Sequence, residues 1–160
     1  MTSRVVGETE LVELVRADRA AGKSVAFANG CFDVLHVGHV RYLEAAAAEA
    51  DRLVVAVNDD QSVAGLKGSG RPILAVSDRA ELVAALRGVD YVVTFSGRTV
   101  EPLIRLIKPD VHCKGTDYTV DSVPERSVVL EYGGRTAIVG DPKNHATREL
   151  IERIAGPRRA

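Results

Sequence analysis

Hydrophobic residues recur along this 160-residue chain in two alternating patterns. Short, continuous apolar runs such as Arg52–Val57 are typical of strands that other elements cover on both faces of a sheet. Between these runs, apolar residues return at helical spacing, as Leu82, Val83 and Leu86 do. Five strands are predicted, at Ser24–Ala28, Arg52–Val57, Tyr91–Phe95, Val111–Cys113 and Thr136–Val139.

The segments between the strands predict helices. Asp78 and Glu81 have the spacing of a capping box, and Pro124 is tolerated because it falls in a first turn. Because strands and helices alternate, we expect one α/β domain over residues 1–160 with a doubly wound, five-stranded parallel sheet. Residues 1–22 would form an N-terminal helical arm and residues 24–155 the core. The predicted helices are Glu10–Ala21, Val40–Ala50, Gln61–Leu66, a segment from Ser77 to Gly88, Thr99–Ile107, Asp121–Tyr132 and Thr147–Ala155.

Composition excludes several classes of function. A net charge of −1 and few aromatic residues give no reason to expect a nucleic-acid partner. No apolar run reaches the roughly 20 residues that span a membrane, and the first residues lack the apolar core of a signal peptide. Two cysteines, Cys31 and Cys113, do not make a disulfide framework, so we expect free thiols in a cytoplasmic protein.

The stretch Asn29–His39 carries the most chemistry. It joins a predicted strand to a predicted helix, and in an open α/β sheet such a turn binds ligands. His36 and His39 share one helical face, and Gly38 allows a ligand to approach the backbone. The following helix directs free N–H groups and the positive end of its dipole to the same place. The pattern favours a polyphosphate site, the alternative being two structural histidines at a helix start.

A zinc site is the other chemistry that these histidines suggest. Zinc needs a third and a fourth ligand, and the remaining candidates are His112, His145, Cys31 and Cys113. None of them stands at ligand spacing, so we expect no metal held by the protein itself.

The residues Gly30-Cys31-Phe32-Asp33 and His36-Val37-Gly38-His39 resemble the signature of the HxGH nucleotidylyltransferase superfamily, in its cytidylyltransferase-like branch. Within that branch the chain is most similar to the adenylyltransferase domain of ADP-heptose synthesis, which acts on D-glycero-β-D-manno-heptose 1-phosphate. The resemblance implies a Rossmann-like nucleotidylyltransferase fold. Its matching segments are Phe27–Leu43, Asp51–Asn58, Leu66–Ile73, Asp78–Val93, Lys108–Tyr118 and Leu150–Ile154.

The resemblance also implies a reaction, in which a phosphate monoester attacks the α-phosphorus of a nucleoside triphosphate and releases pyrophosphate. ATP and a sugar 1-phosphate such as heptose 1-phosphate are the expected substrates, and Mg²⁺ accompanies the triphosphate. His36 and His39 would stabilise the charge on the α-phosphate, and Asp33 would face the acceptor. The nucleotide would be held by Asn29, Gly30, Cys31, Phe32 and Gly38.

Two further segments match the family. The loop Leu66–Pro72 matches LKGxGRP, so Lys67 would close over the triphosphate as a catalytic residue, while Arg71 would add charge on the acceptor side. The alternative is a solvated basic loop. The segment Lys114–Tyr118 matches KGxDY, so Lys114, Gly115 and Asp117 would bind the nucleotide.

Two more residues are candidates for the acceptor. Asp59 and Asp60 follow a strand, where Asp60 would hold sugar hydroxyls unless the pair merely ends the strand. The resemblance assigns Arg79 to the acceptor phosphate, and the alternative is a solvent-facing helix charge.

The chain departs from the family at its last helix. A Ser-Thr-Thr or similar signature usually binds the β- and γ-phosphates there, whereas this chain has Ala146-Thr147-Arg148. Thr147 remains the candidate for nucleotide binding, and Lys143 and His145 lie nearby in the sequence.

Two other functions stay open at this point. One is a cytidylyltransferase for an alcohol phosphate such as glycerol or ethanolamine phosphate. The other is a nucleotide-binding module without catalysis, which the altered segment Ala146-Thr147-Arg148 favours. Because relatives are often dimers, we expect a homodimer.

Overall fold

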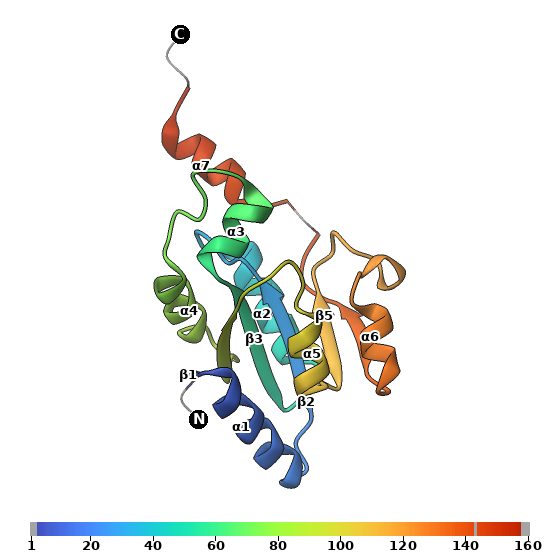
Figure 1. The fold of residues 1–160 in the computed structure, drawn as a ribbon. Helices are drawn as coiled ribbons and strands as arrows, with labels where there is room; N and C mark the ends of the chain where they lie inside the picture. The colour runs from blue at the N-terminus through green and yellow to red at the C-terminus, as the bar shows by residue number, and fades with distance from the viewer. Residues whose placement is uncertain (1–2, 143, 158–160) are drawn as a thin grey trace.

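The computed structural model describes residues 3–142 and 144–157, and in it one parallel sheet of six strands runs through the molecule (Figure 1). The strand order is β1-β4-β3-β2-β5-β6. The strands are β1 (Arg4–Val5), β2 (Val25–Gly30), β3 (Arg52–Asn58), β4 (Tyr91–Phe95), β5 (Val111–Lys114) and β6 (Arg135–Ile138). The helices are α1 (Glu8–Ala20), α2 (Val37–Ala47), α3 (Asp60–Lys67), α4 (Val76–Ala84), α5 (Glu101–Ile107), the 3₁₀ turn η1 (Val120–Ser122), α6 (Arg126–Glu131) and α7 (Thr147–Ala155).

The order of the strands reverses at β2. Strands β3 and β4 follow on one side of it and β5 and β6 on the other, with Ala28 of β2 paired to Val55 of β3 and to Cys113 of β5. Such a reversal leaves a crevice at the carboxyl ends of the strands, which is where ligands bind in doubly wound folds. The turn after β2 therefore lies at the switch point of the sheet.

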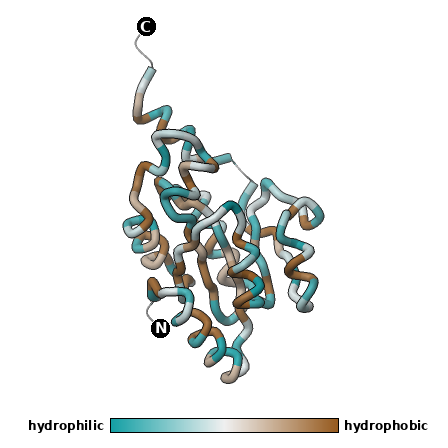
Figure 2. Tube along the Cα trace, viewed as in Figure 1, coloured by the Kyte–Doolittle hydropathy of each residue, from teal (hydrophilic) through white to brown (hydrophobic). Residues whose placement is uncertain are grey.

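Two hydrophobic clusters cover the two faces of the sheet. Phe27 and Val54 point to the face covered by α1, α5 and α6, whereas Ala28 and Val55 point to the face covered by α2 and α4. All four are fully buried, which confirms the prediction that these continuous apolar runs are covered on both sides. Figure 2 shows the hydrophobic residues gathered along these strands and on the inner sides of the helices.

The prediction of five strands was one strand short. The sixth, β1, has only two residues and pairs in parallel with β4, Arg4 opposite Tyr91 and Val5 opposite Val92. A two-residue strand carries no recognisable period, because its conformation depends on the partner strand. The five predicted strands are all present.

Two details of the predicted helices were also wrong. The helix expected over Asp121–Tyr132 is divided into η1 and α6, and Pro124 lies in the break. The expected capping box at Asp78 and Glu81 does not form, because α4 already begins at Val76 with Ala75 as its N-cap residue. Local spacing alone did not show that the chain turns helical two residues earlier.

None of the helices in the described part of the chain is both long enough and apolar enough to cross a membrane.

Candidate functional site

The turn between β2 and α2 places two imidazoles at the start of the helix. His36 is the N-cap residue of α2, and its Nδ1 accepts the backbone N–H of Gly38 at 3.1 Å. The Nδ1 of His39 accepts the backbone N–H of His36 at 3.3 Å. An imidazole whose Nδ1 is an acceptor carries the proton of its neutral form on Nε2. The helix cap therefore gives both histidines an Nε2–H donor.

The two rings are stacked, with centroids 3.9 Å apart and an interplanar angle of 26°. Gly38 makes this arrangement possible, since a Cβ at that position would lie 2.9 Å from atoms of the His36 ring. The sequence suggested that Gly38 leaves room for a ligand. In the structure the space above Gly38 is occupied by the His36 ring.

The backbone before the helix is bent into an unusual shape. Phe32 and Val34 have φ angles of 50° and 55°, in the left-handed region that is uncommon for residues with side chains and a true outlier for a β-branched one. Phe32 is buried, its ring lies 5.5 Å from that of His39, and Gly30 leaves room for it. Such conformations cost about 1–3 kcal/mol each and cluster at functional sites.

Asp33 holds the basic loop in place. Its buried carboxylate accepts the N–H groups of Ile73 and Leu74, at 2.8 and 3.0 Å, and the Nε–H of Arg71 at 2.9 Å. Burial favours the neutral acid, but these three hydrogen bonds outweigh it and hold the pKa of Asp33 below its ordinary value. Two of the four candidates for the acceptor side, Asp33 and Arg71, are thus engaged with each other.

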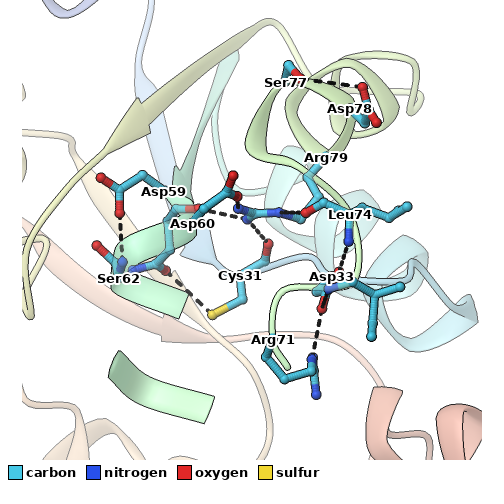
Figure 3. A network of polar contacts seen from close by, with 12 residues as sticks. Cys31, Asp33, Asp59, Asp60, Ser62, Arg71, Leu74, Ser77, Asp78 and Arg79 are labelled. Atoms are coloured by element: carbon cyan, nitrogen blue, oxygen red, sulfur yellow. Dashed lines mark hydrogen bonds and ion pairs between the residues drawn. The ribbon is translucent and has the colours of Figure 1, made fainter. Parts of the chain in front are cut away.

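Arg79 is fully buried, so the alternative of a solvent-facing charge is wrong. Its Nε–H donates to the carbonyl of Leu74, and one terminal nitrogen donates to the carbonyls of Cys31 and Asn58. The other terminal nitrogen donates to Asp60 Oδ1 at 2.7 Å. Figure 3 shows this guanidinium at the centre of the network, where it ties together the ends of β2 and β3, the basic loop and α3.

The two aspartates after β3 have separate structural partners. Asp59 is the N-cap of α3 and accepts the N–H of Ser62 at 2.8 Å, while Asp60 is half exposed and accepts from Arg79. Asp59 therefore has a structural role at the junction of β3 and α3, which agrees with the alternative that it simply ends the strand. Asp60 keeps an exposed part beside the site.

The charge of Lys67 acts on the thiol of Cys31. Lys67 is the exposed last residue of α3. Burial raises the pKa of the Cys31 thiol, while the positive charges of Lys67, Arg79 and Arg71 favour the thiolate. The positive charge of Lys67 therefore acts at the turn after β2.

The end of β5 contributes a second cation. The Nζ of Lys114 lies 3.9 Å from Glu125 Oε2 and 4.6 Å from the centroid of the Tyr118 ring. Gly115 follows, and a Cβ there would lie 3.1 Å from Asp117 Oδ1. Sequence reasoning missed Glu125, because nothing in the mixed polar sequence around Pro124 distinguishes it from the neighbouring Asp121 and Arg126.

Asn29, at the end of β2, has a buried partner on the neighbouring strand. The Nε2 of His112 lies 2.9 Å from Asn29 Oδ1, and burial, with the charge of Lys114, lowers the pKa of His112 to about 3. The sequence offered His112 only as a zinc ligand. Its part in orienting Asn29 follows from strand register, which the sequence does not reveal.

The residues at the start of α7 also contact the turn after β2. The hydroxyl of Thr147 donates to the carbonyl of Asp33 at 2.9 Å, and Arg148 pairs with Glu152 on the exposed surface. His145 lies beside His36. Lys143 lies outside the described residues.

Cys31 and Cys113 are free thiols, as predicted. Cys113 is opposite Ala28, three residues before Cys31, so the strands bring them near one another without placing them side by side. Within residues 3–142 and 144–157, no three His, Cys, Asp or Glu side chains gather as ligands for a metal.

All of these groups lie at or near the carboxyl ends of β2, β3 and β5, around the first turn of α2. A family model described as cytidylyltransferase-like matches residues 27–153, which includes every one of the candidate site residues. The chain belongs to the cytidylyltransferase-like family. This confirms the resemblance and the Rossmann-like α/β fold that it implied.

Relatives of this cytidylyltransferase-like chain include two proteins named bifunctional protein HldE. The one from Pseudomonas fluorescens strain Pf0-1 is 47% identical over 150 residues, and the one from strain SBW25 is 50% identical over 136 residues. These matches cover 94% and 85% of this chain but only 32% and 29% of the relatives. The chain thus spans about a third of the length of the curated relatives it matches.

A solved structure has a similar fold. The lipopolysaccharide core biosynthesis protein from Thermoplasma volcanium GSS1 superposes with a TM-score of 0.66 at 26% sequence identity. The superposition covers 76% of this chain and 100% of that one.

Proposed function

We propose that this protein transfers the adenylyl group of ATP to the phosphate of a sugar 1-phosphate of the heptose type and releases pyrophosphate. The observation that carries the proposal is the capped pair of imidazoles, because the two rings are stacked 3.9 Å apart at the start of α2 and the cap gives each of them an Nε2–H donor. The N–H groups at this N-terminus also favour an anion.

The chemistry is an in-line displacement at phosphorus. An oxygen of the acceptor phosphate forms a bond to the α-phosphorus, and the bond from the α-phosphorus to the oxygen that bridges to the β-phosphorus breaks. The leaving pyrophosphate keeps that bridging oxygen and its electron pair, so no covalent enzyme intermediate is needed. His36 and His39 donate to the α-phosphate oxygens as their charge changes, which is the preorganised stabilisation that accelerates such reactions.

The remaining residues divide into two groups. Lys67 closes over the triphosphate, and Asn29, Lys114, Gly115 and Asp117 form the pocket for the nucleoside. Asp33 and Arg79 act by positioning, since their polar atoms are already engaged in holding the loop and the strand ends. Arg71, which Asp33 fixes at 2.9 Å, presents the rest of its guanidinium to the acceptor.

Mg²⁺ enters with the triphosphate as part of the substrate. Since Mg²⁺ prefers phosphate and water oxygens with one or two carboxylates, the phosphates of ATP would supply most of its ligands. When bound, it neutralises charge on the phosphates.

We propose the heptose-type acceptor and the homodimer from the similarity of this chain to its relatives. The sugar branch is supported by the matching segments Leu66–Ile73 and Lys108–Tyr118 and by the identity to the HldE proteins. We also propose one domain that acts as a homodimer.

A pyrophosphate-release assay across ATP and CTP, each with heptose 1-phosphate, glycerol phosphate or ethanolamine phosphate, tests the proposal. We expect release with ATP and heptose 1-phosphate. Release only with CTP and an alcohol phosphate would identify the other branch of the family. If nucleotide binds but no pair reacts, the chain is a binding module.

A further inference from the structure

Gly140 and His145, which lie between β6 and α7, both pack against the first two turns of α2. Gly140 makes the close approach possible, since a Cβ there would lie 3.2 Å from the Cα of Tyr42 and its φ is 93°. Further on, the Cβ of His145 is 3.4 Å from the position that a Cβ on Gly38 would take. His145 therefore lies beside Gly38 as well, next to the His36 ring.

This position brings a third imidazole to the site. The ring centroid of His145 is 6.3 Å from that of His36, and the His145 side chain is half-buried. His36 thus has His39 on one side, at 3.9 Å, and His145 within reach on another.

The polar side chains that follow His145 in the sequence already have other partners. Thr147 gives its single hydroxyl proton to the carbonyl of Asp33, so in this arrangement it has none to give to a phosphate. Arg148 is exposed and paired with Glu152, and Ala146 carries no polar group. Among residues 144–148, His145 is the one whose polar side chain lines the cavity beside His36.

A cavity of about 220 Å³ lies between the two histidines and α7. Its charged groups are Arg153 and Glu149, one helical turn apart on α7, so the carboxylate is offset by a guanidinium. Since the first turn of α7 also points N–H groups toward this corner, the cavity favours an anion. The cavity is lined by His36, Val37, His145, Ala146, Glu149, Leu150 and Arg153.

We infer that His145 is a third phosphate-binding imidazole, which donates to the β- and γ-phosphates of the triphosphate and to the pyrophosphate that leaves. The inference rests on the proposed nucleotidyl transfer. A triphosphate whose α-phosphate meets His36 and His39 brings its next phosphates into the cavity that His36 and His145 share. The imidazole of His145 donates to these phosphates, because the hydroxyl of Thr147 already donates to the carbonyl of Asp33.

The test compares His145→Ala and His145→Gln with Asn144→Ala, a neighbouring exposed residue that does not line the cavity. Loss of one preorganised donor predicts a fall of about 100-fold in kcat/KM for ATP in His145→Ala. The glutamine variant recovers part of this loss, because its amide also donates, and Asn144→Ala stays within about twofold of wild type on the ordinary behaviour of surface substitutions.

Two readouts separate phosphate binding from a merely structural role. The inhibition constant for pyrophosphate rises at least as much as the KM for ATP, whereas the KM for the acceptor is unchanged. In an imidazole ¹H–¹⁵N spectrum of the wild-type protein, the His145 signals shift saturably with pyrophosphate. Unchanged kinetics in His145→Ala, or a His145 signal that ignores pyrophosphate, overturns the inference.

The proposed function can fail separately. If the wild-type protein turns over no substrate pair, adenylyl transfer is wrong, and the spectroscopic titration still decides whether His145 binds phosphate. If His145→Ala does not fold, the glutamine variant and the wild-type titration decide.

Discussion

The backbone N–H of His36 donates to the Nδ1 of His39 at 3.3 Å, so one histidine holds the other in a single tautomer. The same bond closes the first turn of α2. The helix start and the reactive side chains are therefore one structure, and each of the following predictions depends on that coupling or on the network that supports it.

The tautomer of His39 predicts which substitute retains activity. His39→Ala lowers kcat by about 100- to 1,000-fold, the usual loss for one preorganised donor. His39→Gln retains more activity than His39→Asn, because the glutamine amide reaches the position of Nε2 whereas the asparagine amide reaches only that of Nδ1. Steady-state pyrophosphate release measures all three. A better rescue by asparagine would contradict the assigned tautomer.

Gly38→Ala separates stability from activity. An alanine Cβ would lie 2.9 Å from the His36 ring, so the ring has to turn away. The gain from alanine in a helix, at most about 1 kcal/mol, is offset by loss of the His36 cap, which also costs about 1 kcal/mol. We expect a nearly unchanged free energy of unfolding, with kcat at least tenfold lower by loss of a donor. Urea unfolding and the same assay check this, and an active Gly38→Ala protein would show that the His36 ring position is unimportant.

Arg79→Met tests whether Arg79 positions the site or binds the acceptor. Methionine leaves the carbonyls of Leu74, Cys31 and Asn58 without their donor, at about 1–3 kcal/mol for each unsatisfied group, so we expect a loss of several kcal/mol in the free energy of unfolding. Arg87→Met, on the exposed side of the same region, is the matched control and changes stability by at most about 0.5 kcal/mol. A stable Arg79→Met protein with a raised KM for the acceptor would instead support direct contact with the acceptor phosphate.

His112 makes the stability depend on pH. Its pKa is about 3 in the folded protein, because burial disfavours the cation, and about 6.5 in an unfolded chain. Between these values the unfolded chain binds a proton that the folded protein does not, so stability falls as the pH drops below 6.5. At pH 5 the loss from this group is about 2 kcal/mol.

Urea unfolding at pH 7 and pH 5 measures this loss. In His112→Gln, which keeps a donor near Asn29 but does not titrate, the difference between the two pH values shrinks by about the same 2 kcal/mol. Equal differences in wild type and variant would show that the imidazole is not buried in its neutral form.

Local sequence patterns predicted most of the fold. The five longer strands and the parallel α/β class followed from apolar runs and helical spacing, because burial on two sides selects such runs wherever they stand. The strand β1 and the break at Pro124 did not, since two residues carry no period and a 3₁₀ turn has no separate pattern.

The sequence by itself determined the turn Asn29–His39, since its glycines and histidines at fixed spacing act within one helical turn. Only the tertiary structure decided what surrounds the turn. Asp33 meets residues 71–74, Arg79 meets Cys31 and Asp60, and His145 meets His36. These contacts join residues 19 to 109 positions apart, and they exist because parallel strands bring distant loops to the same edge of the sheet.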